Sequence, residues 1–140
     1  MVRLELMKTT IVQSIEFSKR IVENLTNLWV TVKKADLAAD GRKKKGLDAP
    51  SFATAGSFLY VAYEDEKVLY VGETRVSVKS RFLGDGSGSH KNKEWYSRVT
   101  HINYVKAIHD ELTDNHRKLL EQALSINLSP EFYGKSNKEG

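Results

Sequence analysis

Cysteine is absent from this chain, and long apolar runs are absent as well. Without cysteine the protein has no disulfide, no thiolate zinc site and no cysteine nucleophile, and the absence fits a reducing compartment. No stretch approaches the roughly 18 apolar residues of a membrane span, and the first ten residues lack the apolar core of a signal peptide. We therefore expect a soluble cytoplasmic protein that does not enter membranes.

Several common catalytic motifs are also missing. The sequence has no GxxxxGK[ST] phosphate loop, no HExxH, no GxSxG and no calcium-loop pattern of carboxylates. The four histidines are not spaced as a zinc set; they are His90, His101, His109 and His116. These absences argue against nucleotide triphosphate hydrolysis and hydride transfer.

The charge that is present is unevenly distributed. The 140 residues suffice for one ordinary core, since 40% are hydrophobic and 29% are charged. The formal net charge is +4, and the whole surplus lies in residues 1–56, which hold 10 Lys or Arg against 6 Asp or Glu. Four consecutive cations have the density that attracts a phosphate backbone, and a solvated loop is the alternative. They are Arg42, Lys43, Lys44 and Lys45.

Apolar residues recur at helical spacing between residues 8 and 34, where neither proline nor glycine occurs. They are Ile11, Ile15, Val22, Leu25, Trp29 and Val32, with Ile21 and Leu28 beside them. The pattern predicts one long amphipathic helix, whose apolar face must cover the main sheet or pair with a second copy in a homodimer. Small residues, the basic run and Pro50 then predict a loop over residues 35–56.

The pattern changes to strands after residue 56. Residues 57–63 (SFLYVAY) and 68–72 (VLYVG) predict a β-hairpin around the acidic turn 64–67. Alternating residues at 99–108 predict a third strand. The expected fold class is therefore α+β, with a small three-stranded antiparallel sheet flanked by helices.

Two further helices are expected around these strands. Thr74 or Ser77 is placed to cap a short helix after the hairpin. Thr113 or Asp114 is placed to cap a last helix at 115–128, which Pro130 would end.

Two tyrosines, an arginine and a carboxylate form the candidate site. Antiparallel pairing of the hairpin strands brings Tyr60 and Tyr70 near one surface beside Arg81. Glu121 lies within the apolar stripe of the last helix, where a carboxylate needs a partner. The partner is either Mg²⁺, which one or two carboxylates commonly hold together with substrate phosphate, or Arg117 four residues earlier.

These residues carry a resemblance to a known family. The segment FLY at 58–60 and the segment YVG at 70–72 have tyrosines ten residues apart, and Arg81 lies eleven residues further on. Glu121 in a later helix is followed by Pro130. In order and spacing this pattern resembles the GIY-YIG nuclease domain, over residues 57 to about 133. The family fold, a three-stranded antiparallel sheet with flanking helices, agrees with the fold expected from the pattern of the residues.

The resemblance implies a metal-dependent DNA endonuclease that hydrolyses phosphodiester bonds by water attack. Tyr60 would activate the water as general base or proton relay, and Tyr70 would position water and phosphate. Arg81 would neutralise charge on the scissile phosphate, and Glu121 would bind one Mg²⁺ or Mn²⁺. His90 is a second candidate base, because some restriction-type members of the family carry a histidine shortly after the arginine.

Two positions depart from the family pattern. Phe58 stands where glycine is usual, so the local geometry of the first motif is expected to differ from that of the family. Tyr133 stands where an asparagine often follows the proline, and Asn137 is the nearest asparagine. Two alternatives therefore stay open: a nucleic-acid-binding module on the same fold with impaired catalysis, and an interaction protein that dimerises through the helix at 8–34.

Residues 73–106 carry seven cations against three acids, which predicts a surface for DNA phosphates. The candidates for DNA binding besides Arg81 are Arg75, Lys79, Lys91, Lys93, Arg98 and Lys106. Trp95 and Tyr96 are placed either to stack on a base or to anchor the core. We expect residues 57–140 to form the nuclease-like domain, with residues 1–56 packed on it or extending it.

Overall fold

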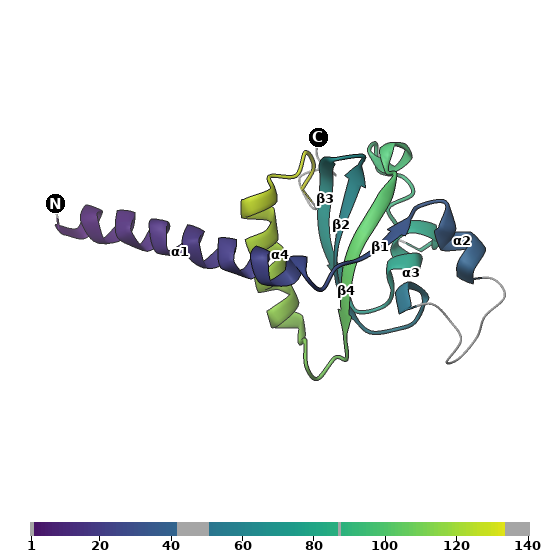
Figure 1. Ribbon diagram of the computed structural model, residues 1–140, viewed down its shortest axis with the longest axis horizontal. Coiled ribbons are helices and arrows are strands. Elements are labelled where there is room, and N and C mark those ends of the chain that lie inside the picture. Colours follow the sequence, from purple (N-terminus) through teal and green to yellow (C-terminus); the bar gives the residue numbers. More distant parts are fainter. Residues whose placement is uncertain (1, 42–50, 87, 134–140) are drawn as a thin grey trace.

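A four-stranded antiparallel sheet with the strand order β1-β4-β2-β3 forms the centre of the molecule (Figure 1). The strands are β1 (Val30–Lys33), β2 (Ser57–Glu64), β3 (Lys67–Thr74) and β4 (His101–Ala107). The structure is a computed structural model, and it describes residues 2–41, 51–86 and 88–133. The α+β class is confirmed, but the sheet has four strands where three were expected.

Helices cover both faces of this sheet. They are α1 (Val2–Thr26), α2 (Asp36–Gly41), α3 (Val78–Leu83) and α4 (Asp114–Leu128), with 3-10 turns η2 (Ser51–Ala53) and η3 (Tyr96–Arg98). On one face, α4 and the C-terminal part of α1 enclose a core around Leu124; on the other, α2, α3 and η2 enclose a core around Phe82 (Figure 1). Among the described residues, no helix is long and apolar enough to cross a membrane.

The central strand β2 is buried on both faces. Phe58 and Tyr60 belong to the core on the α3 face, whereas Leu59 and Val61 belong to the core on the α4 face. This explains why its sequence is a continuous apolar run and not an alternating one. Phe58, the departure from the family glycine, is fully buried against Tyr104, and β2 pairs with both neighbouring strands through this position.

The predicted helix at 8–34 is wrong at its C-terminal end. The chain leaves α1 after Thr26, and Val30–Lys33 form the edge strand β1, which pairs with β4 in the register Val32↔Ile102. Val32, expected on the helix stripe, is instead buried in this strand. The VTV sequence has the β-branched side chains that favour strands, and pairing with β4 decides between the two structures.

The other expected elements agree better with the structure. The hairpin is present but longer than expected, with a turn in which Asp65 has a φ of 52°. Ser77 caps α3 and Thr113 caps α4, each accepting a hydrogen bond from a backbone N–H three residues on. Residues 35–56 are not all loop, since they contain α2 and η2, and the run Arg42–Lys45 lies outside the described residues.

Candidate active site

A pocket of about 860 Å³ lies at the edge strand β3 of the sheet. It is bounded by α4, from one face of the sheet, and by α3 with the segment that follows it, from the other. All five residues predicted to be catalytic line this pocket; they are Tyr60, Tyr70, Arg81, His90 and Glu121. The structure thus brings together groups that are up to 61 residues apart in the sequence.

Tyr60 reaches the pocket from the central strand because Gly72 has no side chain. The two residues face each other in the β2–β3 register, and the Tyr60 ring passes over Gly72. A Cβ atom at position 72 would lie 2.4 Å from Cζ of Tyr60, closer than non-bonded carbon atoms can approach. Gly72 is therefore required for the position of the Tyr60 hydroxyl.

The hydroxyl of Tyr60 is hydrogen-bonded to His90, with 2.7 Å between Oη and Nε2. The backbone N–H of His90 donates to the carbonyl of Arg81 at 2.6 Å, which fixes the histidine against α3. Both side chains are buried, at 1% and 6% exposed. Burial raises the pKa of Tyr60 well above its usual value. Burial, with the charges of Arg81 and Lys93, lowers the pKa of His90 to about 3, so both groups are neutral at pH 7.

The ring of Tyr70 contacts the rings of both His90 and Trp95. Its ring stacks on Trp95 with centroids 4.8 Å apart and meets the His90 ring edge-on at 5.0 Å. Burial, followed by the charge of Glu121, raises the pKa of Tyr70 to about 12. Trp95 is fully buried and Tyr96 donates to the carbonyl of Phe82, so these aromatic residues anchor the core and do not present a stacking platform for a base.

Arg81 is held from two sides and keeps one donor group for a ligand. Its Nε donates to Oγ1 of Thr74 at 3.1 Å, and its Nη1 donates to the carbonyl of Gly88 at 2.8 Å. No hydrogen bond joins Nη2 to any described residue. A planar guanidinium fixed in this way presents its remaining N–H groups in a defined direction, which suits a phosphate oxygen.

Two carboxylates line the pocket. Burial, with the charge of Glu73 as the next cause, raises the pKa of Glu121 to about 7. The expected alternative partner of Glu121 was Arg117, and this expectation is wrong: Arg117 binds Glu73 at 3.1 Å and also binds Asp114. Arg117 is 3% exposed and also donates to Oγ of Ser57 at 2.9 Å, so it links α4 to β3 and β2.

Glu73 and Glu121 both line the pocket and lie close enough to interact electrostatically. Among the described residues, no group of three or more His, Asp or Glu side chains is arranged to hold a metal ion. Mg²⁺, however, commonly takes only one or two carboxylates and completes its shell with water and phosphate oxygens. Burial and Glu73 disfavour the ionised form of Glu121, and a bound cation would favour it.

Of the predicted DNA-binding cations that the structure describes, some line the pocket and others lie outside it. Lys93 lines the pocket, and Lys118, which the sequence did not single out, lines it from α4. Three others lie outside the pocket lining in ion pairs with acids: Arg75 with Asp114, Lys91 with Asp85, and Arg98 with both Glu64 and Glu131. Lys79 and Lys106 do not line the pocket.

Comparison of the chain with protein-family models, with curated proteins and with solved structures found no match. The site therefore has to be judged on its own geometry and chemistry.

Two pocket residues that sequence reasoning missed had a signal in the sequence. Lys118 lies three residues before Glu121 on α4, and residues three apart share a helix face. Glu73 directly follows Gly72 at the end of the hairpin. Tyr133, at the position of the missing asparagine, also lines the pocket.

Proposed function

We propose that this protein is a divalent-metal-dependent DNA endonuclease of the GIY-YIG type. One observation carries the proposal: five residues chosen from the sequence for this chemistry line a single pocket, although they come from different elements. Each residue alone has an ordinary structural explanation, such as a strand aromatic or a surface charge. Those separate explanations do not account for the position of all five side chains on one concave surface.

The pocket suits a phosphodiester backbone. Arg81, Lys93 and Lys118 line it together and supply positive charge on both sides of the sheet edge. Arg81 would bind a non-bridging phosphate oxygen through Nη2, since its other nitrogens are held by Thr74 and Gly88. This contact would stabilise the charge that accumulates on the phosphorus oxygens during attack.

The Tyr60–His90 pair would accept the proton of the attacking water. A tyrosine with a raised pKa is a poor base alone, but its bond to His90 allows a relay: Tyr60 takes a proton from water as its own proton passes to Nε2. His90 is a weak acceptor first because it is buried, and then because of the charges of Arg81 and Lys93. A bound phosphate would offset the two charges and so would strengthen His90 as a proton acceptor, while the effect of burial remains.

Glu121 would hold the metal ion, and Glu73 is the second carboxylate in the pocket that could contribute to its binding. The cation, when bound, would supply Lewis-acid polarisation of the phosphate and stabilise the leaving oxygen. Glu121 would bind the cation in its ionised form, with its proton released to solvent, and Arg117 would keep Glu73 in place. Tyr70, held by its contacts with His90 and Trp95, would orient water and phosphate by its hydroxyl.

The direct test is nicking of supercoiled plasmid DNA by the purified chain with Mg²⁺ or Mn²⁺. We expect nicked product with the wild type, no product with EDTA, and at least a hundredfold loss in Glu121→Gln, as for loss of a major electrostatic contribution. Arg81→Lys should lose most activity despite its kept charge. Glu111→Gln is the matched control, since Glu111 is exposed and lies outside the pocket lining.

Absence of cleavage by the folded wild-type protein with either metal would overturn the proposal. Cleavage that persists in Glu121→Gln at the wild-type rate would overturn the assignment of the pocket. If the protein binds DNA without cutting it, the alternative of a binding module on this fold replaces the enzyme.

A further inference from the structure

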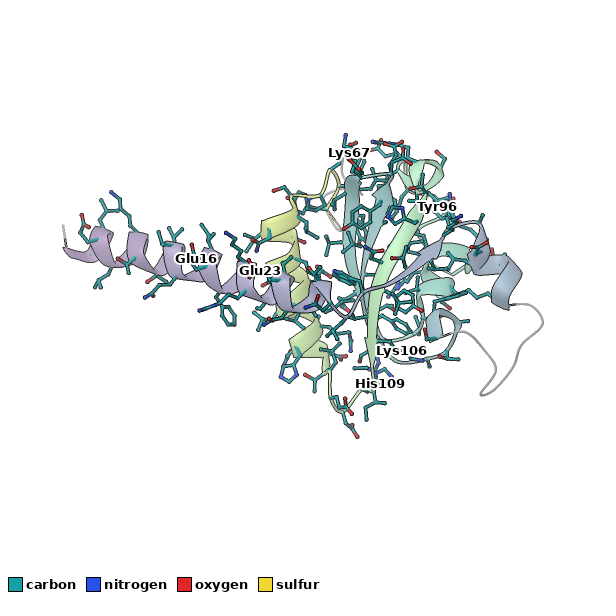
Figure 2. The ribbon with its side chains drawn as sticks, viewed as in Figure 1. Glu16, Glu23, Lys67, Tyr96, Lys106 and His109 are labelled. Carbon is teal, nitrogen blue, oxygen red and sulfur yellow. The ribbon has the colours of Figure 1, made fainter. Side chains whose placement is uncertain are left out.

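The N-terminal half of α1 presents an apolar face to solvent. Figure 1 shows that the C-terminal end of α1 crosses α4, whereas the N-terminal part of α1 projects away from the sheet. Figure 2 places Glu16 on the projecting part and Glu23 at the crossing. Seven large apolar side chains of this part are exposed, and four of them follow one stripe: Leu4 at 52%, Met7 at 55%, Ile11 at 57% and Ile15 at 47%. The other three, Leu6, Val12 and Phe17, lie off this stripe. Monomeric proteins rarely expose contiguous apolar surface of this kind without a partner.

The exposed face continues a face that is already packed. At 3.6 residues per turn, the four side chains lie in line with Ser18, Val22 and Leu25. Val22 and Leu25 pack into the core beneath α4, and Nδ2 of Asn127 donates to Oγ of Ser18 at 2.7 Å. One stripe therefore serves two purposes: its C-terminal part holds α1 on the domain, and its N-terminal part is left for another helix.

We propose that the projecting half of α1 pairs with the same half of a second copy, antiparallel, in a symmetric homodimer. The four exposed side chains of the stripe are all apolar, so two copies of this part are self-complementary, as an isologous twofold interface requires. Residues 2–17 carry two cations and two acids, and residues 9–15 carry no charge. A neutral face has no attraction for DNA or for an anionic lipid surface, which leaves apolar contact as the basis of recognition.

The position of α4 decides the direction of pairing. Because α4 already covers the stripe from Ser18 onward, a partner helix has room only along residues 2–17, a length of about 24 Å. In a parallel pair the partner's α4 would occupy the same volume as this chain's α4. In an antiparallel pair it lies beyond the opposite end of the helix, where nothing obstructs it.

Full overlap of the two free halves fixes the register. Residue 2 of one copy lies opposite residue 17 of the other, so that Leu4 faces Ile15 of the second copy and Ile15 faces its Leu4. The twofold axis passes between Thr9 and Thr10. The inference concerns the helix alone and does not rest on the proposed nuclease function.

The mass of the full chain in solution tests the dimer. In sedimentation experiments from low to a few hundred micromolar, we expect the wild type to approach twice 15.9 kDa as the concentration rises. Ile11→Asp should stay monomeric throughout, because it places a charge at the centre of the stripe. Gln13→Asp adds the same charge on the opposite, exposed face of the helix and should dimerise like the wild type. A monomeric wild type, or equal behaviour of the two variants, would overturn the proposal.

Cross-linking tests the orientation without depending on a charged variant. The chain has no cysteine, so single cysteines report only the chosen positions. When Leu4→Cys and Ile15→Cys proteins are mixed and treated with a short bismaleimide, we expect the mixed product, in good yield. Gln13→Cys, on the outer face, should give none. Products of Leu4→Cys with itself would indicate parallel helices and overturn the antiparallel arrangement.

Discussion

The hydroxyl oxygen of Tyr60 lies 2.7 Å from Nε2 of His90, and both side chains are almost completely removed from solvent. The bond joins the central strand β2 to the segment after α3, so it fixes this side of the pocket on the sheet. It also has a cost at low pH, because the buried imidazole resists protonation: its pKa is lowered from 6.5 to about 3.

The lowered pKa of His90 predicts how stability depends on pH. Between the unfolded pKa of 6.5 and the folded pKa of about 3, the unfolded chain binds a proton at His90 that the folded chain does not. The free energy of unfolding therefore falls as pH falls through this window, by about 3 kcal/mol between about pH 7 and about pH 4. His90→Gln lacks this contribution. Urea unfolding at the two pH values measures this difference, and the wild type should lose about 3 kcal/mol more than the variant. Equal losses would contradict a lowered pKa for His90 in the folded protein.

Gly72→Ala should displace the Tyr60 ring. The added Cβ would meet Cζ of Tyr60 at 2.4 Å, and the ring cannot move away without disturbing its contacts with the Phe82 and His90 rings. Overpacking of this kind costs about 1–3 kcal/mol. Gly86→Ala is the matched control, because no atom lies within 4 Å of the Cβ it would add, and it should change stability by less than about 0.5 kcal/mol. Urea denaturation measures both; similar losses would exclude a specific clash at position 72.

Three of the four strands of this fold were readable from the sequence, but the edge strand β1 was not. The run from Ser57 to Tyr63 has aromatic and β-branched residues and is long enough for a strand only, and the structure confirms it. Trp29 and Val32 continue the helical spacing of α1, so the local pattern favours helix through them. Pairing with β4, a contact across 70 residues of sequence, overrides that pattern.

The candidate site was predictable where its residues belong to one local pattern. Tyr60, Tyr70 and Arg81 follow from the hairpin and the helix after it, and they line the pocket as expected. Glu73 was missed because the pocket wraps around the edge of the sheet at β3. The sequence alone does not indicate that β3 is an edge strand. The pairs of Arg98 with Glu64 and Glu131 join residues more than 30 apart and have no local signal.

Arg117→Ala should strongly destabilise the protein. Arg117 is 3% exposed and binds Glu73 and Asp114, so its removal leaves Glu73 without its cation at the edge of the core. Breaking a buried pair costs about 3–5 kcal/mol. Lys118→Ala, one residue on and exposed, should change the free energy of unfolding by less than about 0.5 kcal/mol.

A double mutant separates the ion pair from simple loss of packing. If the cost arises from an unpaired carboxylate, then adding Glu73→Gln to Arg117→Ala should recover part of the lost stability, because no charge is left unpaired. Additive losses in urea unfolding would show instead that the two side chains act independently.

The pKa of Glu121, raised to about 7, predicts that divalent-ion binding weakens in acid. A cation binds the carboxylate and competes with its proton, so affinity should be nearly constant above pH 7 and fall about tenfold for each pH unit below it. Isothermal titration of the chain with Mn²⁺ at about pH 8, 7 and 6 measures this dependence. Glu121→Gln should bind weakly at every pH, whereas Glu111→Gln, exposed and outside the pocket lining, should follow the wild type. An affinity that is equal at the highest and lowest pH would remove Glu121 as the ligand, because a carboxyl group that is protonated near neutral pH cannot hold a cation without releasing that proton.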